Sequence, residues 1–288
     1  MSSKVEEWTV LSMLEWATDF FEEKGIPDPR HSIEWLLAET LNIKRLDLYL
    51  EFDRPLSSSE LDTLRPLVKR RANHEPLQYI VGFTDFMNAR ISVDESVLIP
   101  RLETEQLVEI ILDEHPEDQE CSVLDLGTGS GCIPVALKME RPSWSITGID
   151  ISKEALKVAQ QNAHQNEVDI SFAEGDILSP DTIDVQHSQD IIISNPPYIT
   201  HDEKDLLEPQ VREYEPHGAL FLDDIEKMYG SIIQFAQKNL ADDGMLYLEI
   251  HEEYSQKIIN LFDEDNWAAT IQEDYDKKPR FITAKIRS

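Results

Sequence analysis

From Cys121 to the end of the chain, short apolar runs alternate with longer stretches whose apolar residues recur at helical spacing. A strand followed by a crossover helix and a second strand is typical of a doubly wound parallel sheet, so this order predicts an α/β fold. The predicted strands are Ser122–Leu126, Ser145–Asp150, Ile170–Ala173, Asp190–Ser194, Met245–Ile250, Ala268–Gln272 and Phe281–Ile286. The predicted helices are Cys132–Met139, Lys153–Gln165, Ile225–Leu240 and Tyr254–Leu261.

The first part of the chain is patterned for helices. Apolar residues recur at helical spacing in Trp8–Lys24, and a second helix fits Ser32–Leu41. A third helix is expected after Ser57, because Ser57 and Glu60 have the spacing of a capping box. These helices end near His74 and predict a small bundle.

The segment that joins the bundle to the α/β region has the pattern of a β-hairpin. Two short alternating runs, Gln78–Val81 and Ala89–Val93, flank a turn region at Gly82–Asn88, and a helical run, Glu103–Leu112, follows them. We therefore predict three parts, which are a helical domain over residues 1–75, a hairpin linker over 76–98 and an α/β domain over 99–288.

A glycine-rich loop follows the first predicted strand of the α/β region. Gly127, Gly129 and Gly131 lie between that strand and the next helix, where glycines let the backbone turn tightly and approach a ligand. Asp150 ends the second strand, and a carboxylate at that place can accept both hydroxyls of a ribose. This context predicts a cofactor site; the alternative is a tight turn that binds nothing.

The sequence Asn195-Pro196-Pro197-Tyr198 comes directly after an apolar strand. Proline is excluded from a central strand, so the strand ends here and the loop is stiff. The Asn195 carbonyl and the Pro196 backbone carbonyl can each accept one N–H of a target NH₂ group, and Tyr198 offers a flat face for a planar group. Such a grip orients a weakly nucleophilic nitrogen for attack. The alternative is a proline turn that only caps a strand.

Composition restricts the partners and the compartment. The formal net charge is −31, and residues 91–288 alone hold 41 acidic and 15 basic residues, which gives −26. A field of that sign repels phosphate backbones, so direct nucleic-acid binding is not expected. No apolar run is long enough to span a membrane, and Met1–Glu7 lacks a signal pattern, so a cytoplasmic protein without a membrane partner is expected.

The loop spacing G-x-G-x-G resembles that of class I methyltransferases and differs from the G-x-G-x-x-G of dinucleotide binders. The resemblance implies a Rossmann-like methyltransferase sheet that binds S-adenosyl-L-methionine and releases S-adenosyl-L-homocysteine, without a metal. It places Asp176 at the adenine amino group and Ile177 against the adenine ring. The implied cofactor-binding residues are Gly127, Thr128, Gly129, Ser130, Gly131, Asp150, Asp176, Ile177 and Asn195.

The tetrad at Asn195 is similar to that of amino-methyltransferases, and four flanking stretches resemble the HemK/PrmC family of release-factor glutamine methyltransferases nearly end to end. These stretches are His74–Gly82, Val97–Glu105, Tyr214–Leu220 and Leu248–Ile250. The resemblance implies methyl transfer to the glutamine of the Gly-Gly-Gln loop of class I peptide chain release factors, with the helical domain helping to recognise that partner. The implied catalytic residues are Asn195, Pro196, Pro197 and Tyr198.

Three positions depart from the family pattern. Leu102 stands where the family usually has a second proline, His251 stands where glycine is usual, and Ser32–Glu34 is an atypical variant of its helix. None of these lies in the cofactor loop or the tetrad, so the departures bear on the fit of the partner and not on the chemistry. The chain is expected to act as a monomer.

Several other residues keep two interpretations. Arg101 is either one half of an ordinary surface ion pair or a pocket-lining residue. Asp125 lies near the cofactor's amino group or caps neighbouring backbone. The histidines show no spacing that predicts a cluster with cysteine or acidic ligands, so no metal site is expected.

Other classes of function remain open from these residues. An adenine or guanine methyltransferase acting on DNA or RNA shares the tetrad, but a basic face or an added recognition domain would be expected of it. A dehydrogenase is disfavoured by the glycine spacing, and a non-catalytic cofactor-binding module is disfavoured by the intact Asn195 and Tyr198.

Overall fold

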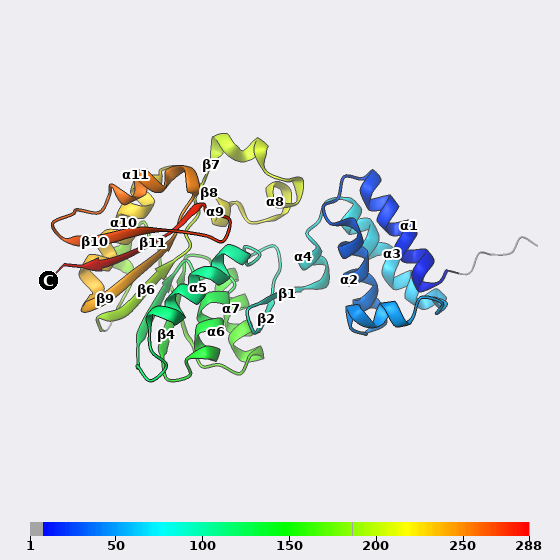
Figure 1. The fold of residues 1–288 in the computed structure, drawn as a ribbon, viewed down its shortest axis with the longest axis horizontal. Coiled ribbons are helices and arrows are strands. Elements are labelled where there is room, and N and C mark those ends of the chain that lie inside the picture. Colours follow the sequence, from blue (N-terminus) through cyan, green and yellow to red (C-terminus); the bar gives the residue numbers. More distant parts are fainter. Residues whose placement is uncertain (1–7, 186, 288) are drawn as a thin grey trace, which may run out of the picture. The chain divides into compact units, whose positions relative to one another are not determined.

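The computed structural model of the chain describes residues 8–185 and 187–287. The predicted lack of a signal pattern at Met1–Glu7 therefore concerns residues outside the described part. The chain forms two compact units, which are Met1–Gly82 with Glu208–Tyr214, and Phe83–Leu207 with Glu215–Ser288 (Figure 1). The predicted domain boundaries, between residues 75 and 76 and between residues 98 and 99, stay a prediction.

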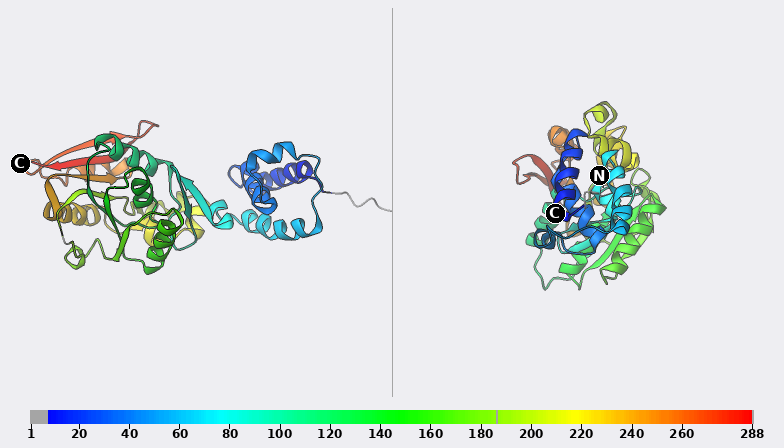
Figure 2. Two further views of the ribbon diagram at one scale, coloured as in Figure 1. Left: turned by 90° about the horizontal axis from the view of Figure 1, so that it is seen from below. Right: turned by 90° about the vertical axis from the view of Figure 1, so that its right-hand side faces the viewer.

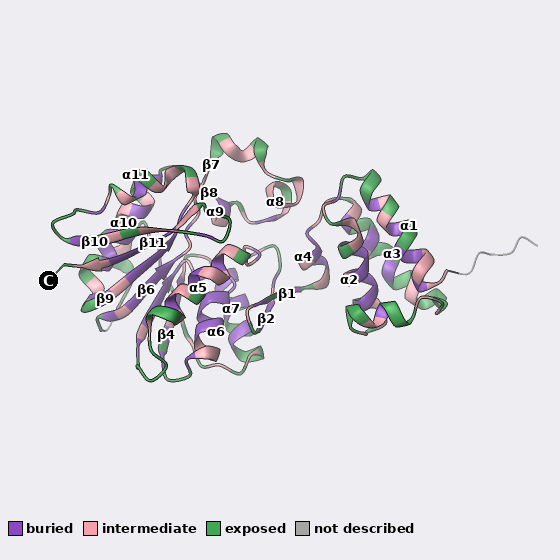
Figure 3. Ribbon diagram, in the orientation of Figure 1, coloured by how far each residue is buried: buried purple, intermediate pink, exposed green. Residues whose placement is uncertain are grey.

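The first unit is helical, as predicted. Its elements are α1 (Val10–Glu23), α2 (Pro29–Leu41), η1 (Arg45–Leu50), α3 (Ser58–Ala72), α4 (Leu77–Val81) and α8 (Pro209–Tyr214). The capping box before α3 is confirmed, since the Ser57 hydroxyl accepts the Glu60 N–H and the Glu60 carboxylate accepts the Ser57 N–H. The buried faces of α1, α2 and α3, purple in Figure 3, enclose an apolar core that includes Phe21, Leu36 and Leu64.

The predicted strand at Gln78–Val81 is wrong, because these residues form the short helix α4. Pro76 precedes the helix as its N-cap, and Gly82 ends it in the left-handed conformation, at a φ of 86°. Proline is favourable at a helix start and glycine at its end, and an apolar run of four residues does not distinguish a strand from one helical turn.

The second unit is built on a seven-stranded sheet with the order β10-β11-β9-β6-β3-β4-β5. The strands are β3 (Ser122–Leu126), β4 (Ser145–Asp150), β5 (Ser171–Glu174), β6 (Gln189–Ser194), β9 (Leu240–Glu249), β10 (Trp267–Glu273) and β11 (Pro279–Ile286). Each predicted strand is present, with shifts of at most two residues at its ends except for the strand predicted at Met245–Ile250, which begins five residues earlier, at Leu240. The sheet is parallel from β9 to β5, whereas β11 is antiparallel to both of its neighbours.

Helices cover both faces of this sheet, which confirms the doubly wound α/β class (Figures 1 and 2). On one face, α6 (Cys132–Glu140) packs between α5 (Leu102–Glu114) and α7 (Lys153–Gln165). On the other, α10 (Ile225–Asn239) and α11 (Ser255–Ile259) pack against each other and the strands. The strands at the centre are apolar on both sides, as a sheet buried between two helix layers requires; Ile191, Ile192 and Ile193 of β6 are all fully buried.

A hairpin is present as β1 (Phe83–Phe86) and β2 (Ala89–Ser92), and it belongs to the second unit. Its second strand is the predicted one, whereas its first strand lies within the predicted turn region Gly82–Asn88. Asn162 of α7 holds the hairpin in place. The Asn162 side chain accepts from the Ser92 N–H at 2.8 Å and donates to the Ser92 carbonyl at 3.0 Å. Its amide also donates to the carbonyl of Ser130 at 2.9 Å, so one fully buried side chain joins the hairpin to the glycine loop.

After the tetrad the chain leaves the second unit and returns to it. It runs through β7 (Ile199–Thr200) and η3 (His201–Leu206), contributes α8 to the first unit, and comes back through α9 (His217–Leu220) and β8 (Phe221–Leu222), which pairs with β7. Across residues 8–185 and 187–287, none of the helices has the length and apolar character needed to cross a membrane.

Candidate active site

The glycine loop lies at the carboxyl end of β3, in the centre of the parallel part of the sheet. The backbone N–H groups of Gly127 and Thr128 both donate to the carbonyl of Ile149, at 2.8 and 2.9 Å, which ties the loop to β4. Gly127, Gly129 and Gly131 have φ values of 77°, 53° and 76°, in the left-handed region that only glycine adopts at low cost.

Gly131 also leaves no room for a side chain. A Cβ at this position would lie 3.0 Å from Cβ and 3.2 Å from Cα of Ala159 on α7. Glycine here therefore allows α6 to start directly against α7, so that the N-terminal amides of α6 lie beside the loop.

Asp150 is bound to the same loop. One carboxylate oxygen accepts the N–H of Gly129 at 2.8 Å, and the other accepts the N–H of Ser152 at 2.8 Å. Burial raises the pKa of this carboxyl, although the two backbone bonds oppose the shift. Each oxygen keeps a second lone pair, so the carboxylate can hold the loop and still accept hydroxyl groups of a ligand.

Asp125, on β3, has a carboxyl group that is buried without a partner. The residue is 1% exposed, and neither of its carboxyl oxygens has a hydrogen-bond partner in the described part of the chain; the same is true of the Thr128 hydroxyl. Burial raises the pKa of Asp125 to about 7; the nearby Thr128 hydroxyl opposes the shift, and the charge of Asp150 is the smallest cause and acts in the same direction as burial. Unpaired buried polar groups are costly, and they are the pattern expected where a bound cation or donor completes the site.

One cavity of about 700 Å³ brings the loop and the tetrad together. Of the predicted site residues, the cavity is lined by Gly127, Thr128, Gly129, Ser130, Asp150, Asp176, Ile177, Asn195 and Pro197. Gly131, Pro196 and Tyr198 are not among the described residues that line it. Residues that precede and follow α8 in the sequence complete the wall of the cavity, including His201, His217 and Phe221.

Asn195 lines the same cavity and directly follows β6, the neighbour of β3 in the sheet. Its amide nitrogen donates to the hydroxyl of Thr104 on α5 at 3.1 Å. Because the nitrogen is bound in this way, the carbonyl oxygen is the part of the side chain that can accept from a bound substrate.

Tyr198 lies on the core side of the tetrad. Its ring packs against the core under α10, and its hydroxyl donates to the buried carboxylate of Glu249 at 3.3 Å. Burial and the neighbouring Glu249 charge raise the pKa of the phenol. The ring also lies beside His251, with the two centroids 5.9 Å apart.

Arg101 lines the cavity, as the second interpretation expects, and its ion pair is formed with the buried Glu215 and is not an ordinary surface pair. The Glu215 side chain is 1% exposed and accepts in addition from the Ile99 N–H at 3.2 Å. Glu215 and Glu249 were missed as site residues by reasoning from the residues alone. The only signal for them was their place in two of the family-like flanking stretches.

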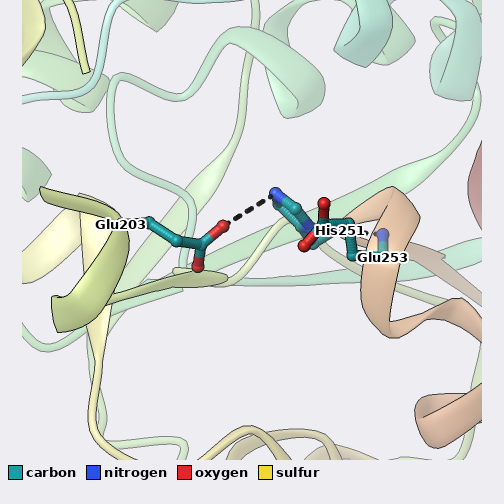
Figure 4. A group of neighbouring side chains, drawn as sticks. All are labelled: Glu203, His251 and Glu253. Carbon is teal, nitrogen blue, oxygen red and sulfur yellow. Dashed lines mark hydrogen bonds and ion pairs between the residues drawn. The ribbon is translucent and has the colours of Figure 1, made fainter. Parts of the chain in front are cut away.

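The prediction that no histidine joins acidic residues is wrong for His251. Glu203, His251 and Glu253 each place one potential ligand atom within 4.8 Å of the others (Figure 4). His251 and Glu203 already have partners: His251 Nδ1 accepts the backbone N–H of Glu253 at 3.2 Å, so Nε2 carries the proton and faces Glu203 at 3.4 Å. Glu203 also accepts the N–H and hydroxyl of Thr200. Through these bonds the three residues connect η3 to η4 (Glu252–Tyr254).

Comparison with known proteins assigns the chain to a family. The model of the PrmC N-terminal domain matches residues 12–82, and the model of the methyltransferase small domain matches residues 103–273. The release factor glutamine methyltransferase of Leptospira interrogans is 39% identical over 279 residues, which is 95% of this chain and 97% of that protein. The chain belongs to the release factor glutamine methyltransferase family.

Other relatives agree with this assignment. The family members from Geobacter sulfurreducens and Lactococcus lactis are 39% and 41% identical, over 91% and 80% of this chain and 91% and 84% of their own lengths. A solved methyltransferase from Pyrococcus furiosus, 14% identical, matches 69% of this chain and 89% of its own with a TM-score of 0.50, which shows the fold. The recognised resemblance and the methyltransferase class are thereby confirmed.

Three of the four flanking stretches that resemble the family lie close together in the structure. Residues of Val97–Glu105, Tyr214–Leu220 and Leu248–Ile250 meet around the tetrad, through the Arg101–Glu215 pair and the Thr104–Glu249 bond at 2.8 Å. Glu215 and Glu249 therefore lie behind Arg101 and Thr104, which line the cavity of this methyltransferase.

Proposed function

We propose that this methyltransferase transfers a methyl group from S-adenosyl-L-methionine to the side-chain amide nitrogen of the glutamine in the Gly-Gly-Gln loop of peptide chain release factors, and so supports translation termination. The observation that carries the proposal is the Asn195 amide. Its nitrogen is bound to Thr104, and its carbonyl oxygen remains to accept an N–H in the cavity that also contains the glycine loop. The names of the relatives support the choice of substrate.

The cofactor fits the residues present. Gly127–Gly131 and the start of α6 would hold its methionine end, and the unpaired Asp125 carboxyl would pair with its ammonium group. Asp150 would accept the ribose hydroxyls, while Asp176 and Ile177 would contact the adenine. Bound S-adenosyl-L-methionine supplies an electrophilic methyl group. We also propose that the reaction needs no metal ion.

The chain's own contribution to the reaction is orientation. An amide nitrogen is a weak nucleophile because its lone pair is delocalised into the carbonyl group. Asn195 Oδ1 and the Pro196 carbonyl would accept its two N–H bonds, aim the lone pair at the methyl group and stabilise the positive charge that develops on nitrogen. The predicted stacking of the planar amide on Tyr198 does not fit the structure, because the Tyr198 ring packs against the core and is not among the described residues that line the cavity. In this proposal Tyr198 anchors the tetrad through its bond to Glu249, and Pro197, which lines the cavity, keeps the loop rigid.

The partner is a protein and not a nucleic acid. The net charge of −26 over residues 91–288 opposes a phosphate backbone, whereas a glutamine side chain brings no charge of its own. We also propose that the enzyme acts as a monomer in the cytoplasm, where release factors function, without a membrane partner.

The test is transfer of labelled methyl from S-adenosyl-L-methionine to a purified class I release factor, run beside a factor whose Gly-Gly-Gln glutamine is replaced by alanine. Label on the unmodified factor alone is expected. Label on both factors would place the acceptor elsewhere, and no label at low or high salt would reject the release factor as substrate.

Two enzyme variants separate the roles of the site residues. Asn195→Ala is expected to abolish transfer and to leave S-adenosylhomocysteine binding within about threefold of wild type, because Asn195 acts mainly on the acceptor. Asp150→Ala is expected to raise the Kd of the cofactor by about tenfold or more, because it removes the ribose acceptor and the Gly129 bond together. Calorimetry measures the cofactor affinity of each variant. Weak cofactor binding in Asn195→Ala together with normal binding in Asp150→Ala would contradict the assignment.

A further inference from the structure

A chain of hydrogen bonds runs from Asn195 into the core. Asn195 Nδ2 donates to Thr104 Oγ1 at 3.1 Å, and the Thr104 hydroxyl donates to Glu249 Oε2 at 2.8 Å. Thr104 is 3% exposed and Glu249 is fully buried. The three residues come from the end of β6, the first turn of α5 and the end of β9, so three separate elements meet at this one contact.

A second branch connects the other end of the tetrad to the same carboxylate. The Tyr198 hydroxyl donates to Glu249 Oε1 at 3.3 Å. The backbone at Glu249 is held as well, because the Tyr229 hydroxyl of α10 donates to its carbonyl at 3.0 Å. Both Asn195 and Tyr198 are therefore attached to Glu249, the first through Thr104 and the second directly.

In this series of hydrogen bonds each group has a fixed role as donor or acceptor, and these roles matter for the chemistry. In its ionised form Glu249 only accepts, so Thr104 donates its single proton to Glu249 and is left with lone pairs for its other neighbour. That neighbour must then be a donor, which selects the NH₂ end of Asn195. A flipped amide would place its oxygen against the Thr104 oxygen and lose the hydrogen bond.

Burying a carboxyl group at this place is costly for folding. Burial raises the pKa of Glu249 to about 7, while the bond from Thr104 and the charge of Arg280 oppose the shift. A hydrophobic side chain would fill a core position without this cost. Glutamate at this position is explained if its acceptor oxygens have a task beyond packing.

We propose that Thr104 and Glu249 are positioning residues that hold the Asn195 amide with its carbonyl oxygen directed to the acceptor nitrogen of the substrate. The inference rests on the proposed function, in which that oxygen accepts one N–H of the glutamine amide. Neither residue touches the reacting atoms in this proposal, and both act through Asn195 and Tyr198.

The test compares Thr104→Val with Thr104→Ser in the release-factor methylation assay. Valine keeps the shape and removes the hydroxyl, so the Asn195 amide loses its fixed orientation; kcat is expected to fall by about 10- to 100-fold. The Kd of S-adenosylhomocysteine is expected to stay within about threefold of wild type. Serine keeps the hydroxyl and should restore kcat to within about threefold of wild type.

Glu249→Gln provides a second variant that does not depend on Thr104. The amide oxygen of glutamine can accept from one hydroxyl, but its NH₂ group cannot accept from the other, so kcat should fall by about tenfold with cofactor binding retained. A Thr104→Val kcat within threefold of wild type would overturn the inference. A parallel loss of cofactor affinity in both variants would show a general structural role and would also overturn it. If the wild-type enzyme itself fails to label the release factor, the proposed function fails instead.

Discussion

Arg101 and Glu215 are separated by 114 positions in the chain, yet Nη2 of Arg101 lies 2.5 Å from Oε1 of Glu215. The second oxygen of the same carboxylate accepts the N–H of Ile99. One buried side chain thus holds the segment that leads into α5 against the segment that returns from α8. The cavity wall at Arg101 depends on this contact.

Glu215→Ala should therefore destabilise the protein. It leaves the buried Ile99 N–H unpaired and removes the carboxylate from the Arg101 ion pair, so a loss of about 2–3 kcal/mol in the free energy of unfolding is expected. Urea denaturation followed by fluorescence measures it. Glu213→Ala is the control, because Glu213 is exposed and pairs only at the surface, and its effect should stay within about 0.5 kcal/mol. Equal losses in the two variants would contradict this account.

Gly131→Ala should impair both stability and cofactor binding. The left-handed backbone and the 3.0 Å approach to Ala159 together predict a loss of about 1–3 kcal/mol and a cofactor Kd raised by about tenfold. Gly230→Ala is the matched control, since Gly230 lies inside α10 with open space around it and should gain up to about 1 kcal/mol. Thermal unfolding and calorimetry distinguish the two; a tolerated Gly131→Ala would mean that the loop is not under steric constraint.

Asp125→Asn should change how the stability of the cofactor-free protein depends on pH. The folded-state pKa of Asp125 is about 7, well above its value of about 3.9 in an unfolded chain. Between these values the folded state keeps a proton that the unfolded state has lost, so wild-type stability falls as the pH rises through this window. Asparagine does not titrate and removes this contribution.

The difference in unfolding free energy, Asp125→Asn minus wild type, should therefore increase from pH 4 to pH 7 and level off above it. Urea titrations at several pH values measure this difference, in which contributions common to both proteins, such as that of Glu249, cancel. With S-adenosylhomocysteine bound, the wild type should be more stable than Asp125→Asn, because the ammonium group of the ligand would pair with the charged aspartate in the proposed arrangement. A difference that does not vary with pH would show that Asp125 titrates near its ordinary value.

Arg71→Met should release the segment Glu208–Tyr214 from the first unit. Arg71 is 3% exposed and donates to Gln210 at 2.9 Å as well as to Ser32 and the carbonyls of Pro27 and Glu75. Burial lowers the pKa of its guanidinium to about 10, which leaves it charged at neutral pH and dependent on these acceptors. Methionine fills similar space without the donors.

Limited trypsin digestion measures the release, since Arg212 lies in the segment. Cleavage after Arg212 should become about tenfold faster in Arg71→Met, because the free energy of local opening decreases. Arg65→Met, which replaces an exposed arginine on the same helix, should leave the rate unchanged. An unchanged rate in both variants would show that Tyr214, whose hydroxyl donates to the Asn73 carbonyl, is sufficient to hold the segment.

The order of strands and helices and the location of the glycine loop could be predicted from the sequence because they depend on neighbours in the chain. Alternating apolar runs, the Ser57 capping box and the glycines at left-handed positions each record a local preference. The error at Gln78–Val81 comes from the same source: four apolar-alternating residues satisfy both periods, and only Pro76 and Gly82 identified the helix.

The tertiary structure alone decided which distant side chains support the site. Nothing in the local pattern around Thr104 or Glu249 pairs them, because their contact requires α5 and β9 to be placed against the end of β6. The same holds for the Arg101–Glu215 pair and for the packing of α8 in the first unit. Local preferences determine which elements form, whereas the long-range contacts follow only from the layers that bury the sheet. The glycine loop and tetrad were therefore visible in the sequence, and the buried bonds that orient Asn195 were not.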